Sequence, residues 1–267
     1  MNQEFLNIVS IYRDIFKWAD KKGDTDTVLD LEESPDEGAH PLSDKLPGFL
    51  ANDLQVLQEN IEAVKAENPF KTVLLTSSVR HEGSSTIVAN WGRLLARERL
   101  EGLPIDAGET ITGGVLIIDG NLRRPRMHTL FDLDRKRGLT ELLAGELQLD
   151  QVLKAAPRKN LWVITAGKPA ANPADLLGSL LMKGILEESS RRFQVVIIDS
   201  APTTQYAETI ALAKQVEAIV LVVRSGVTRW EVVLSAKKQL RRVNSRLLGV
   251  VLNQRKFYIP EWIYRHI

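Results

Sequence analysis

The sequence predicts an α/β fold in which a mostly parallel, doubly wound sheet carries helices on both faces. The first indication is a series of short, continuous apolar runs, which are expected of strands whose two faces are both covered by helices. The second is that segments with apolar residues at helical spacing alternate with these runs, as in βαβ units. In such a fold, ligands bind at the carboxyl ends of the strands.

Each element is predicted from one stretch of this pattern. The apolar runs predict strands at Thr72–Leu75, Val115–Ile118, Leu161–Ile164, Val195–Ile198, Ala218–Val223 and Leu247–Leu252. Apolar residues on one face of the segment that follows residue 84 predict a helix there: Ile87, Val88, Trp91, Leu94 and Leu95. The same spacing predicts further helices at Pro47–Lys65, Leu139–Ala144, Pro173–Arg191, Ala207–Lys214 and Thr228–Arg242.

Two segments are expected to precede the single domain of residues 47–267. Residues 1–20 have the spacing of an amphipathic helix, which either folds back on the domain or docks on a partner. Few basic residues in that helix argue against docking on a membrane surface. Residues 21–46 are acidic, contain Pro35 and Pro41 and lack apolar periodicity, so we expect a flexible linker.

The composition excludes several classes of protein. The chain has 267 residues, a net charge of +1 and no cysteine. The near-neutral charge gives no argument for a nucleic-acid partner or an anionic membrane. The lack of cysteine excludes disulfides and thiolate metal sites, and it is compatible with a reducing compartment.

No run approaches the roughly 18 apolar residues of a membrane span. Glu4 and Asp14 interrupt any signal-peptide pattern. We expect a cytoplasmic protein.

A phosphate-binding loop is predicted between the first strand and the helix after it. In the pattern G-x-x-x-x-G-K-[ST], backbone N–H groups surround the phosphates, the lysine reaches them and the hydroxyl holds Mg²⁺. Gly83, Ser85 and Thr86 match this pattern, whereas Ser84 takes the lysine position and Ser78 that of the first glycine. This strand, loop and helix therefore resemble the phosphate-binding segment of a P-loop NTPase in which the lysine is missing.

Two further strands end in an aspartate. Asp119 follows the second strand and Asp199 the fourth, and Pro202 comes three residues after Asp199. A strand that ends in Asp beside a phosphate loop is the Walker B arrangement, whose carboxylate holds Mg²⁺. Either aspartate alone could be a helix cap or a turn residue. The three signals in this order predict a nucleotide site, with both aspartates as catalytic residues and Ser85 as a third metal ligand.

With these motifs the sequence resembles the bacterial tyrosine kinases of capsule and exopolysaccharide systems, within the MinD/ParA class of P-loop ATPases. The matching segments are the loop at 76–86, a D-x-D-x-R-like motif at 116–123, a D-x-x-P motif at 196–202, and 122–131, 138–146, 166–179 and 249–254. The resemblance implies ATP and Mg²⁺ as cofactors. It also implies a partner, either the membrane-embedded chain-length regulator (co-polymerase) of the polysaccharide system or a paralogous kinase.

The departures from this family concern the chemistry first. Ser84 replaces the lysine, His81 a usual glycine, and Asn121 the second aspartate of the D-x-D motif. Removing a preorganised charge of this kind costs about 2–4 kcal/mol in the transition state, or roughly 10²–10³ in rate. Asn121 cannot accept a proton as a carboxylate does. Asp119 and Asp199 remain, so Mg²⁺ binding could survive; the alternative is that binding of ATP and Mg²⁺ is weak or lost.

Other departures concern assembly. The family's E-x-x-R-x-x-R motif, which supports ring-shaped oligomers, reads Asn52, Gln55 and Gln58 here. The loss of all three charges predicts a monomer or weak dimer. The C-terminal tyrosine cluster that the family phosphorylates is reduced to Tyr258 and Tyr264.

Other cations of the sequence are candidate replacements for the lysine. Lys71 begins a strand and is expected at the opposite end of the sheet. Arg80 lies within the loop and could grip phosphate through its fork of donors, or it could be a solvated loop residue. Arg123, with its neighbours Arg124 and Arg126, either contacts phosphates or a subunit or is solvated. Asn253 matches an adenine-contacting position of the wider class; a cap or turn is the alternative.

Three functions follow from these expectations. The first is a degenerate member of the family, acting as a regulatory or scaffolding subunit with weak or absent phosphoryl transfer. The second is an active ATP-dependent tyrosine autokinase that tolerates the loss of the lysine. The third is a MinD/ParA-like positioning ATPase. The matches at 122–131 and 166–179 favour the first two.

Overall fold

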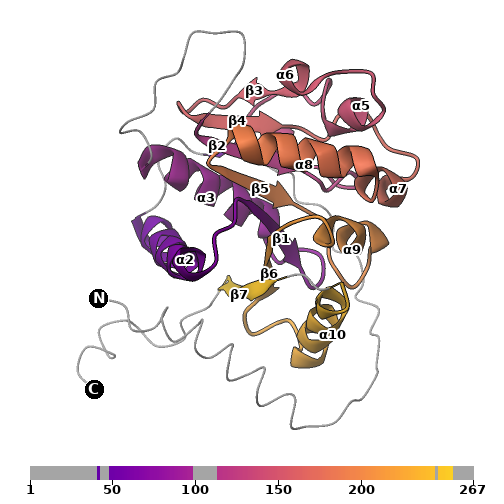
Figure 1. The fold of residues 1–267 in the computed structure, drawn as a ribbon. Coiled ribbons are helices and arrows are strands. Elements are labelled where there is room, and N and C mark those ends of the chain that lie inside the picture. Colours follow the sequence, from indigo (N-terminus) through magenta and orange to yellow (C-terminus); the bar gives the residue numbers. More distant parts are fainter. Residues whose placement is uncertain (1–40, 43–47, 99–112, 244–245, 255–267) are drawn as a thin grey trace, which may run out of the picture.

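The structure is a computed structural model that describes residues 41–42, 48–98, 113–243 and 246–254. Its centre is a seven-stranded sheet in the order β3-β4-β2-β5-β1-β6-β7, and every neighbouring pair is parallel except β3 with β4 (Figure 1). The strands are β1 (Thr72–Ser77), β2 (Val115–Asp119), β3 (Lys154–Ala155), β4 (Leu161–Ile164), β5 (Val195–Asp199), β6 (Ala218–Arg224) and β7 (Leu247–Asn253). The carboxyl ends of β1, β2 and β5 therefore lie at one edge of the sheet.

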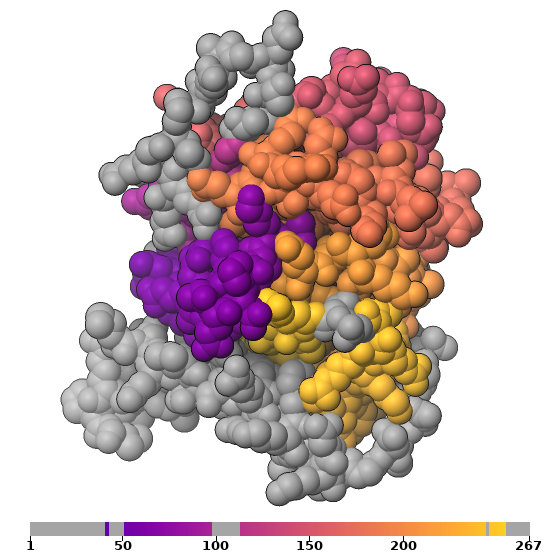
Figure 2. All heavy atoms as spheres, viewed as in Figure 1, coloured from indigo at the N-terminus to yellow at the C-terminus, as the bar shows by residue number. Residues whose placement is uncertain are grey.

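Helices cover both faces of the sheet, which confirms the predicted doubly wound fold. One face carries α2 (Gly48–Glu67), α3 (Ser84–Glu98) and α4 (Met127–Leu130). The other carries α5 (Leu139–Leu143), α6 (Leu149–Val152), α7 (Pro173–Leu177), α8 (Leu180–Arg192), α9 (Ala207–Ala213) and α10 (Trp230–Arg241). In the space-filling view, orange and yellow atoms from the second half of the chain lie next to one another on the face that is shown (Figure 2).

The continuous apolar character of the strands follows from this two-sided cover. In β1, Val73 and Leu75 pack with α2 and α3, whereas Leu74 between them packs with the opposite layer. All three side chains are at most 1% exposed. Because successive side chains point to opposite faces, both faces of a central strand must be apolar.

The structure differs from the sequence-based expectation at the helix predicted for Pro173–Arg191. That segment forms two helices, and the break lies at Gly178–Ser179. Ser179 ends the apolar periodicity of α7 and caps α8, because its hydroxyl accepts a hydrogen bond from the Met182 N–H at 3.1 Å. The prediction of one helix was wrong because the apolar spacing alone does not show that Ser179 caps a new helix. The short α4, α6 and β3 were not predicted, since they are too short for periodicity to show.

The described residues before α2 are Pro41 and Leu42, from the segment predicted as a linker. The Leu42 N–H donates to the carbonyl of Leu130 at 3.0 Å, and the Leu42 side chain packs against the core. The predicted helix at 1–20, the rest of the predicted linker, and Tyr258 and Tyr264 lie outside the described residues. Among the described helices, none combines the length and apolar character needed to cross a bilayer.

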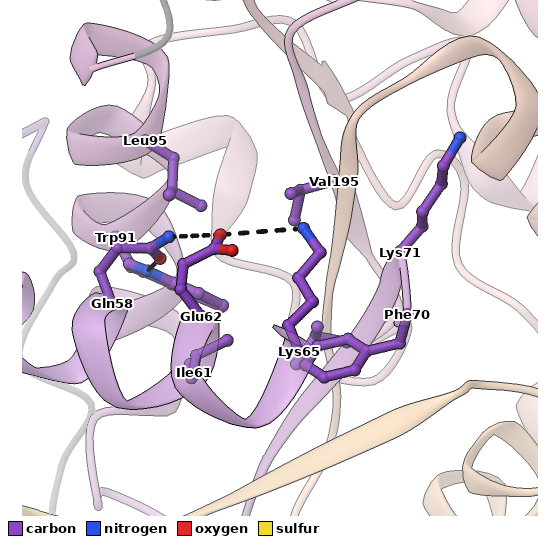
Figure 3. A pocket seen from close by; sticks show the side chains of 10 residues that line it. Gln58, Ile61, Glu62, Lys65, Phe70, Lys71, Trp91, Leu95 and Val195 are labelled. Carbon is purple, nitrogen blue, oxygen red and sulfur yellow. Dashed lines mark hydrogen bonds and ion pairs between the residues drawn. The ribbon is translucent and has the colours of Figure 1, made fainter. Parts of the chain in front are cut away.

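One of the three amides at the family's ring-forming positions points into the domain. The Gln58 side chain is 7% exposed and accepts a hydrogen bond from the Trp91 indole N–H at 2.8 Å, which joins α2 to α3. It also donates to Glu62 at 2.8 Å, and Lys65 lies 3.7 Å from Glu62 (Figure 3). The gap beside these side chains, about 10 Å³, holds at most one water. Asn52 and Gln55 are exposed.

Candidate functional site

A basic cavity lies at the carboxyl ends of β1, β2 and β5. Its volume is about 480 Å³, and the phosphate loop forms one side of it. Residues 121–129, which follow β2, form the other side. Five arginines line it: Arg80, Arg123, Arg124, Arg126 and Arg135. Glu82 is the one carboxylate among the lining residues that the structure describes. A cavity with this excess of guanidinium groups is suited to a multiply charged anion.

The phosphate loop adopts its turn through two left-handed residues. His81 has a φ of 65° and Gly83 a φ of 85°. Glycine suits the second position because a φ of 85° strains any L side chain, and because a Cβ there would displace the Asn253 amide nitrogen, 2.2 Å away. At the first position this chain carries histidine, whose Cβ makes the left-handed conformation unfavourable.

Glu82 holds the loop together from within, and sequence reasoning missed it. Its carboxylate is 1% exposed and accepts hydrogen bonds from the backbone N–H groups of Ser78 at 2.6 Å and Val79 at 3.0 Å. It also accepts from the Arg224 N–H at 3.2 Å and from the Thr228 hydroxyl. No recognised motif marks this glutamate, because its partners come from the β6–α10 connection, some 140 residues away in the chain.

Ser84, at the lysine position, and its neighbour Ser85 both lie beside the Asp199 carboxylate. Ser85 donates its hydroxyl to the Asp199 carboxylate at 2.6 Å. Ser84, which is 9% exposed, also lies beside Asp199, and its side chain acts to lower the pKa of that carboxyl. The loop position that would supply an ammonium group to the phosphates therefore supplies a neutral hydroxyl.

Asp119 and Asp199 form a buried acidic pair in register on β2 and β5. One Asp119 oxygen accepts from the N–H groups of Arg126 and Met127, both at 3.0 Å. The Oδ1 atom of each aspartate is buried without a hydrogen-bond partner among the described residues. Burial raises the pKa of Asp119 to about 7. Burial, and then the charge of Asp119, raise the pKa of Asp199 well above its usual range.

This pair fits the Mg²⁺ ion that the fold implies. Mg²⁺ is commonly held by one or two carboxylates together with phosphate oxygens and waters. The two uncompensated carboxylate oxygens and the Ser85 hydroxyl are such ligands. In the described part of the chain, no group of three or more His, Asp or Glu side chains gathers for a metal. The two carboxylates and the Ser85 hydroxyl would leave the other positions of an octahedral Mg²⁺ ion to waters and phosphate oxygens.

Tyr206, which sequence reasoning did not single out, lies between two of the cavity's arginines. The guanidinium carbons of Arg80 and Arg123 lie 5.5 and 5.0 Å from the centre of its ring. Arg80 also donates to the Tyr206 hydroxyl, and Arg123 pairs with the buried Glu208. The hydrogen bond to Glu208 raises the pKa of Arg123. Both arginines predicted to bind cofactor are thus held at the cavity wall.

The remaining candidates have distinct places. Asn121 accepts a hydrogen bond from the Arg124 N–H at 3.1 Å, and so acts in the turn after β2. Asn253, at the end of β7, donates to the Glu82 carbonyl at 2.8 Å and closes the loop from outside the cavity. Lys71 lies at the other end of β1, as predicted, where its ammonium group donates to the Ser190 carbonyl at 2.7 Å. Thr86 lines the cavity with Gly83, Ser84 and Ser85.

Curated relatives of the chain are protein-tyrosine kinases. It is 33% identical over 202 residues to the tyrosine-protein kinase YwqD of Bacillus subtilis, and the match covers 76% of this chain and 80% of the relative. It is 28% identical over 211 residues to the CapB protein of Staphylococcus aureus, covering 79% of this chain and 87% of the relative. No protein-family model matches the sequence.

Solved structures give the same fold. The chimerical protein CapA2B2 superposes with a TM-score of 0.70 at 24% identity and covers 78% of this chain and 86% of its own. The kinase domain of the Escherichia coli tyrosine kinase ETK gives 0.69 at 22% identity, covering 79% of both chains. The cell-division ATPase MinD of Pyrococcus furiosus gives 0.55 at 18% identity, covering 73% of this chain and 78% of its own.

Proposed function

Because this chain belongs to the bacterial tyrosine kinase family, we propose that it is a degenerate member, with weak or absent phosphoryl transfer. It would serve as a regulatory or scaffolding subunit of an exopolysaccharide or capsule synthesis and export system. Its proposed partners are the membrane-embedded chain-length regulator or a paralogous kinase, which would recruit it from the cytoplasm to the inner face of the membrane. Its near-neutral net charge gives no support to a nucleic-acid partner.

The observation that carries this proposal is the hydroxyl of Ser84 beside Asp199. A loop lysine offers a fixed positive charge to the transferred phosphoryl group, and its loss costs about 2–4 kcal/mol in the transition state. Arg80, the cation nearest in sequence, donates to Tyr206. Asn121 adds to the loss, because an amide cannot take a proton from an attacking hydroxyl.

Nucleotide binding is a weaker requirement than transfer, and several features favour it. The proposed ligands of Mg²⁺ are Asp119, Asp199 and Ser85, and the metal would neutralise phosphate charge. The loop's N–H groups and the arginines of the cavity would contact the phosphates. An ATP-bound or ADP-bound scaffold is therefore compatible with this site.

Calorimetric titration of the purified protein with Mg²⁺ and ATP, beside the Ser84→Lys variant, tests the proposal. Micromolar binding by the wild type, with no phosphotyrosine in its mass spectrum after incubation, would support a nucleotide-bound scaffold. Binding by Ser84→Lys alone would support a scaffold whose site has been abandoned. Phosphotyrosine formed by the wild type at rates typical of kinases, about 1–100 s⁻¹, would overturn the proposal.

The second candidate is an active autokinase. The observation in its favour is that Asp119, Asp199 and Ser85 remain together at the loop. The same mass spectrum decides between the two, and Asp199→Asn is the matched inactive control. A MinD/ParA-like positioning role has weaker support, since the likeness to MinD extends to the fold alone.

A further inference from the structure

The edge of the sheet opposite the cavity is where helices end and strands begin. In a parallel sheet each crossover helix leads back to the amino end of the next strand. The Lys71 ammonium group, just before β1, donates to the carbonyl of Ser190 in the last turn of α8 at 2.7 Å. Arg246, just before β7, donates to the carbonyl of Asn68, the residue after α2, at 3.0 Å. The ends of α2 and α8 therefore meet the amino ends of these strands.

The short connections at this edge, which we call the basic edge, carry mostly positive charge. Those that the structure describes are residues 68–71, 156–160, 193–194, 214–217, 242–243 and 246. They contain one acidic residue, Glu217, and six cationic residues: Lys71, Arg158, Lys159, Lys214, Arg242 and Arg246. All of these cations except Arg158 are exposed. The last turns of α8 and α10 add two more exposed cations, Arg191 and Arg241.

The carboxylates near the basic edge do not cancel this charge. Glu217 is bound within the edge, because its carboxylate accepts two backbone N–H groups at 2.7 and 2.8 Å. Asp150 and Glu188 both pair with Arg192, a further cation at the end of α8. Apart from that pairing, Glu67 and Glu217 stand against seven exposed cations in the described part of this edge. The net charge of +1 does not reveal the surplus, since it includes the acidic segment 21–46.

The cations are spread along the edge and not gathered at one point. Lys159 precedes β4, Lys71 precedes β1 and Arg246 precedes β7, and these strands lie in the order β4-β2-β5-β1-β6-β7. With about 4.8 Å between neighbouring strands, β4 and β7 are about 24 Å apart. A row of cations of this width suits a broad anionic surface better than a single small anion.

A purely structural role explains part of this charge. Cations in the last turn of a helix interact favourably with the helix dipole, which accounts for Arg191 and Arg241. It does not account for Lys159, because the connection that carries this residue follows β3 and no helix. A structural role also predicts a loss of stability on substitution, without any effect on binding to lipid.

We propose that the basic edge docks directly on the headgroups of an anionic lipid bilayer. Attraction between basic residues and such a surface adds up over the residues and falls off within a Debye length. The cavity lies at the carboxyl ends of the strands, so docking by the amino ends leaves it facing the water. The inference goes beyond the proposed function, in which a partner protein recruits the chain, and it requires neither nucleotide nor phosphoryl transfer.

Co-sedimentation of the full-length protein with lipid vesicles tests the proposal. The vesicles contain about 30% phosphatidylserine in phosphatidylcholine, and pure phosphatidylcholine is the comparison. The test variant neutralises four exposed cations of the basic edge: Lys159→Gln, Lys214→Gln, Arg241→Gln and Arg242→Gln. The matched control neutralises four exposed cations on the carboxyl side of the sheet: Lys136→Gln, Arg137→Gln, Lys168→Gln and Arg229→Gln. Both variants lose the same charge, so a difference between them reports the position of the cations.

We expect the wild type and the control to sediment with the anionic vesicles, and not with pure phosphatidylcholine, at about 0.1 M salt. The test variant should bind the anionic vesicles at least about thirtyfold more weakly. If its circular dichroism shows that it is unfolded, Lys159→Gln with Lys214→Gln, which leaves α10 unchanged, should give an intermediate loss.

Three results would overturn the inference. The first is a wild type that does not bind the anionic vesicles, and the second is an equal loss of binding in the test and control variants. The third is tighter binding to duplex DNA of mixed sequence than to the vesicles, lost in the test variant, which would assign the basic edge to nucleic acid. None of these results bears on the calorimetric titration, so the proposed function stands or fails separately.

Discussion

Asp119 and Asp199 lie directly opposite each other on neighbouring parallel strands, and both side chains are fully buried. Burial raises the pKa of Asp119 to about 7 from 3.8. Between these pH values the folded protein holds a proton that the unfolded chain has released. The free energy of unfolding contributed by this group is therefore complete below pH 4 and falls as the pH rises toward 7.

The first prediction concerns this pH dependence. Without divalent cations, the melting temperature should fall between pH 5 and pH 8, and Asp119→Asn should flatten the profile. The amide oxygen of asparagine can still accept from Arg126 and Met127, so the variant removes the charge and keeps the hydrogen bonds. Circular dichroism across this range measures it. A melting temperature that rises with pH in the wild type would contradict the prediction.

Mg²⁺ provides the second prediction. At pH 8, above the pKa of Asp119, the pair should bind the cation in the folded state alone, so millimolar Mg²⁺ should raise the melting temperature of the wild type. Asp199→Asn should abolish the increase, because it removes one of the two carboxylates. Calcium, which prefers more oxygen ligands at longer distances, serves as the comparison ion. Equal stabilisation of wild type and variant by Mg²⁺ would place the cation elsewhere.

His81 shows how far the conformation of the loop could be predicted from the sequence. From the sequence, its place in the loop of a family that usually has glycine there already indicated an unusual residue. The φ of 65° supplies the physical reason. By contrast, Glu82 and Tyr206 could not be predicted, since their partners are brought to the loop by β6 and α9. Strand-end aspartates are predictable because a parallel sheet places all its carboxyl ends together. Contacts between single side chains that are far apart in the sequence are not predictable in this way.

The third prediction follows from that backbone conformation. His81→Gly should raise the free energy of unfolding by about 1 kcal/mol, because glycine adopts a positive φ without a Cβ clash. His81→Ala is the matched control: it removes the imidazole but keeps the Cβ, and should give no such gain. Urea denaturation measures both. If alanine stabilised as much as glycine, the imidazole and not the backbone would be the source of the effect.

Gln58 shows how a sequence position can be assigned to the wrong surface. The loss of charge at the family's ring-forming positions was apparent from the sequence, but the inward turn of this side chain toward Trp91 was not. Its burial depends on how closely α2 packs on α3, which residue types alone do not fix. The Gln58 amide joins α2 to α3 within the domain, while Asn52 and Gln55 remain exposed.

The fourth prediction separates these roles. Gln58→Ala should lower the free energy of unfolding by about 1–3 kcal/mol, because the buried indole N–H of Trp91 loses its acceptor. Gln55→Ala, on the exposed side of the same helix, should change it by less than about 0.5 kcal/mol. Light scattering at micromolar concentration should show a monomer or weak dimer for both variants and the wild type. A stable octamer would refute the expected loss of ring formation.

The last prediction concerns the carboxylate that organises the phosphate loop. Glu82→Ala should lower the free energy of unfolding by more than about 3 kcal/mol, because it leaves several buried donors, among them the Ser78 and Val79 N–H groups, without an acceptor. Glu82→Gln keeps one acceptor oxygen and should lose less. Hydrogen exchange at the Ser78 and Val79 amides gives a local readout, since both should lose protection even where β1 does not. Unchanged protection in Glu82→Ala would mean that the loop keeps its shape without the carboxylate, and that its turn is fixed by Gly83 and Asn253 instead.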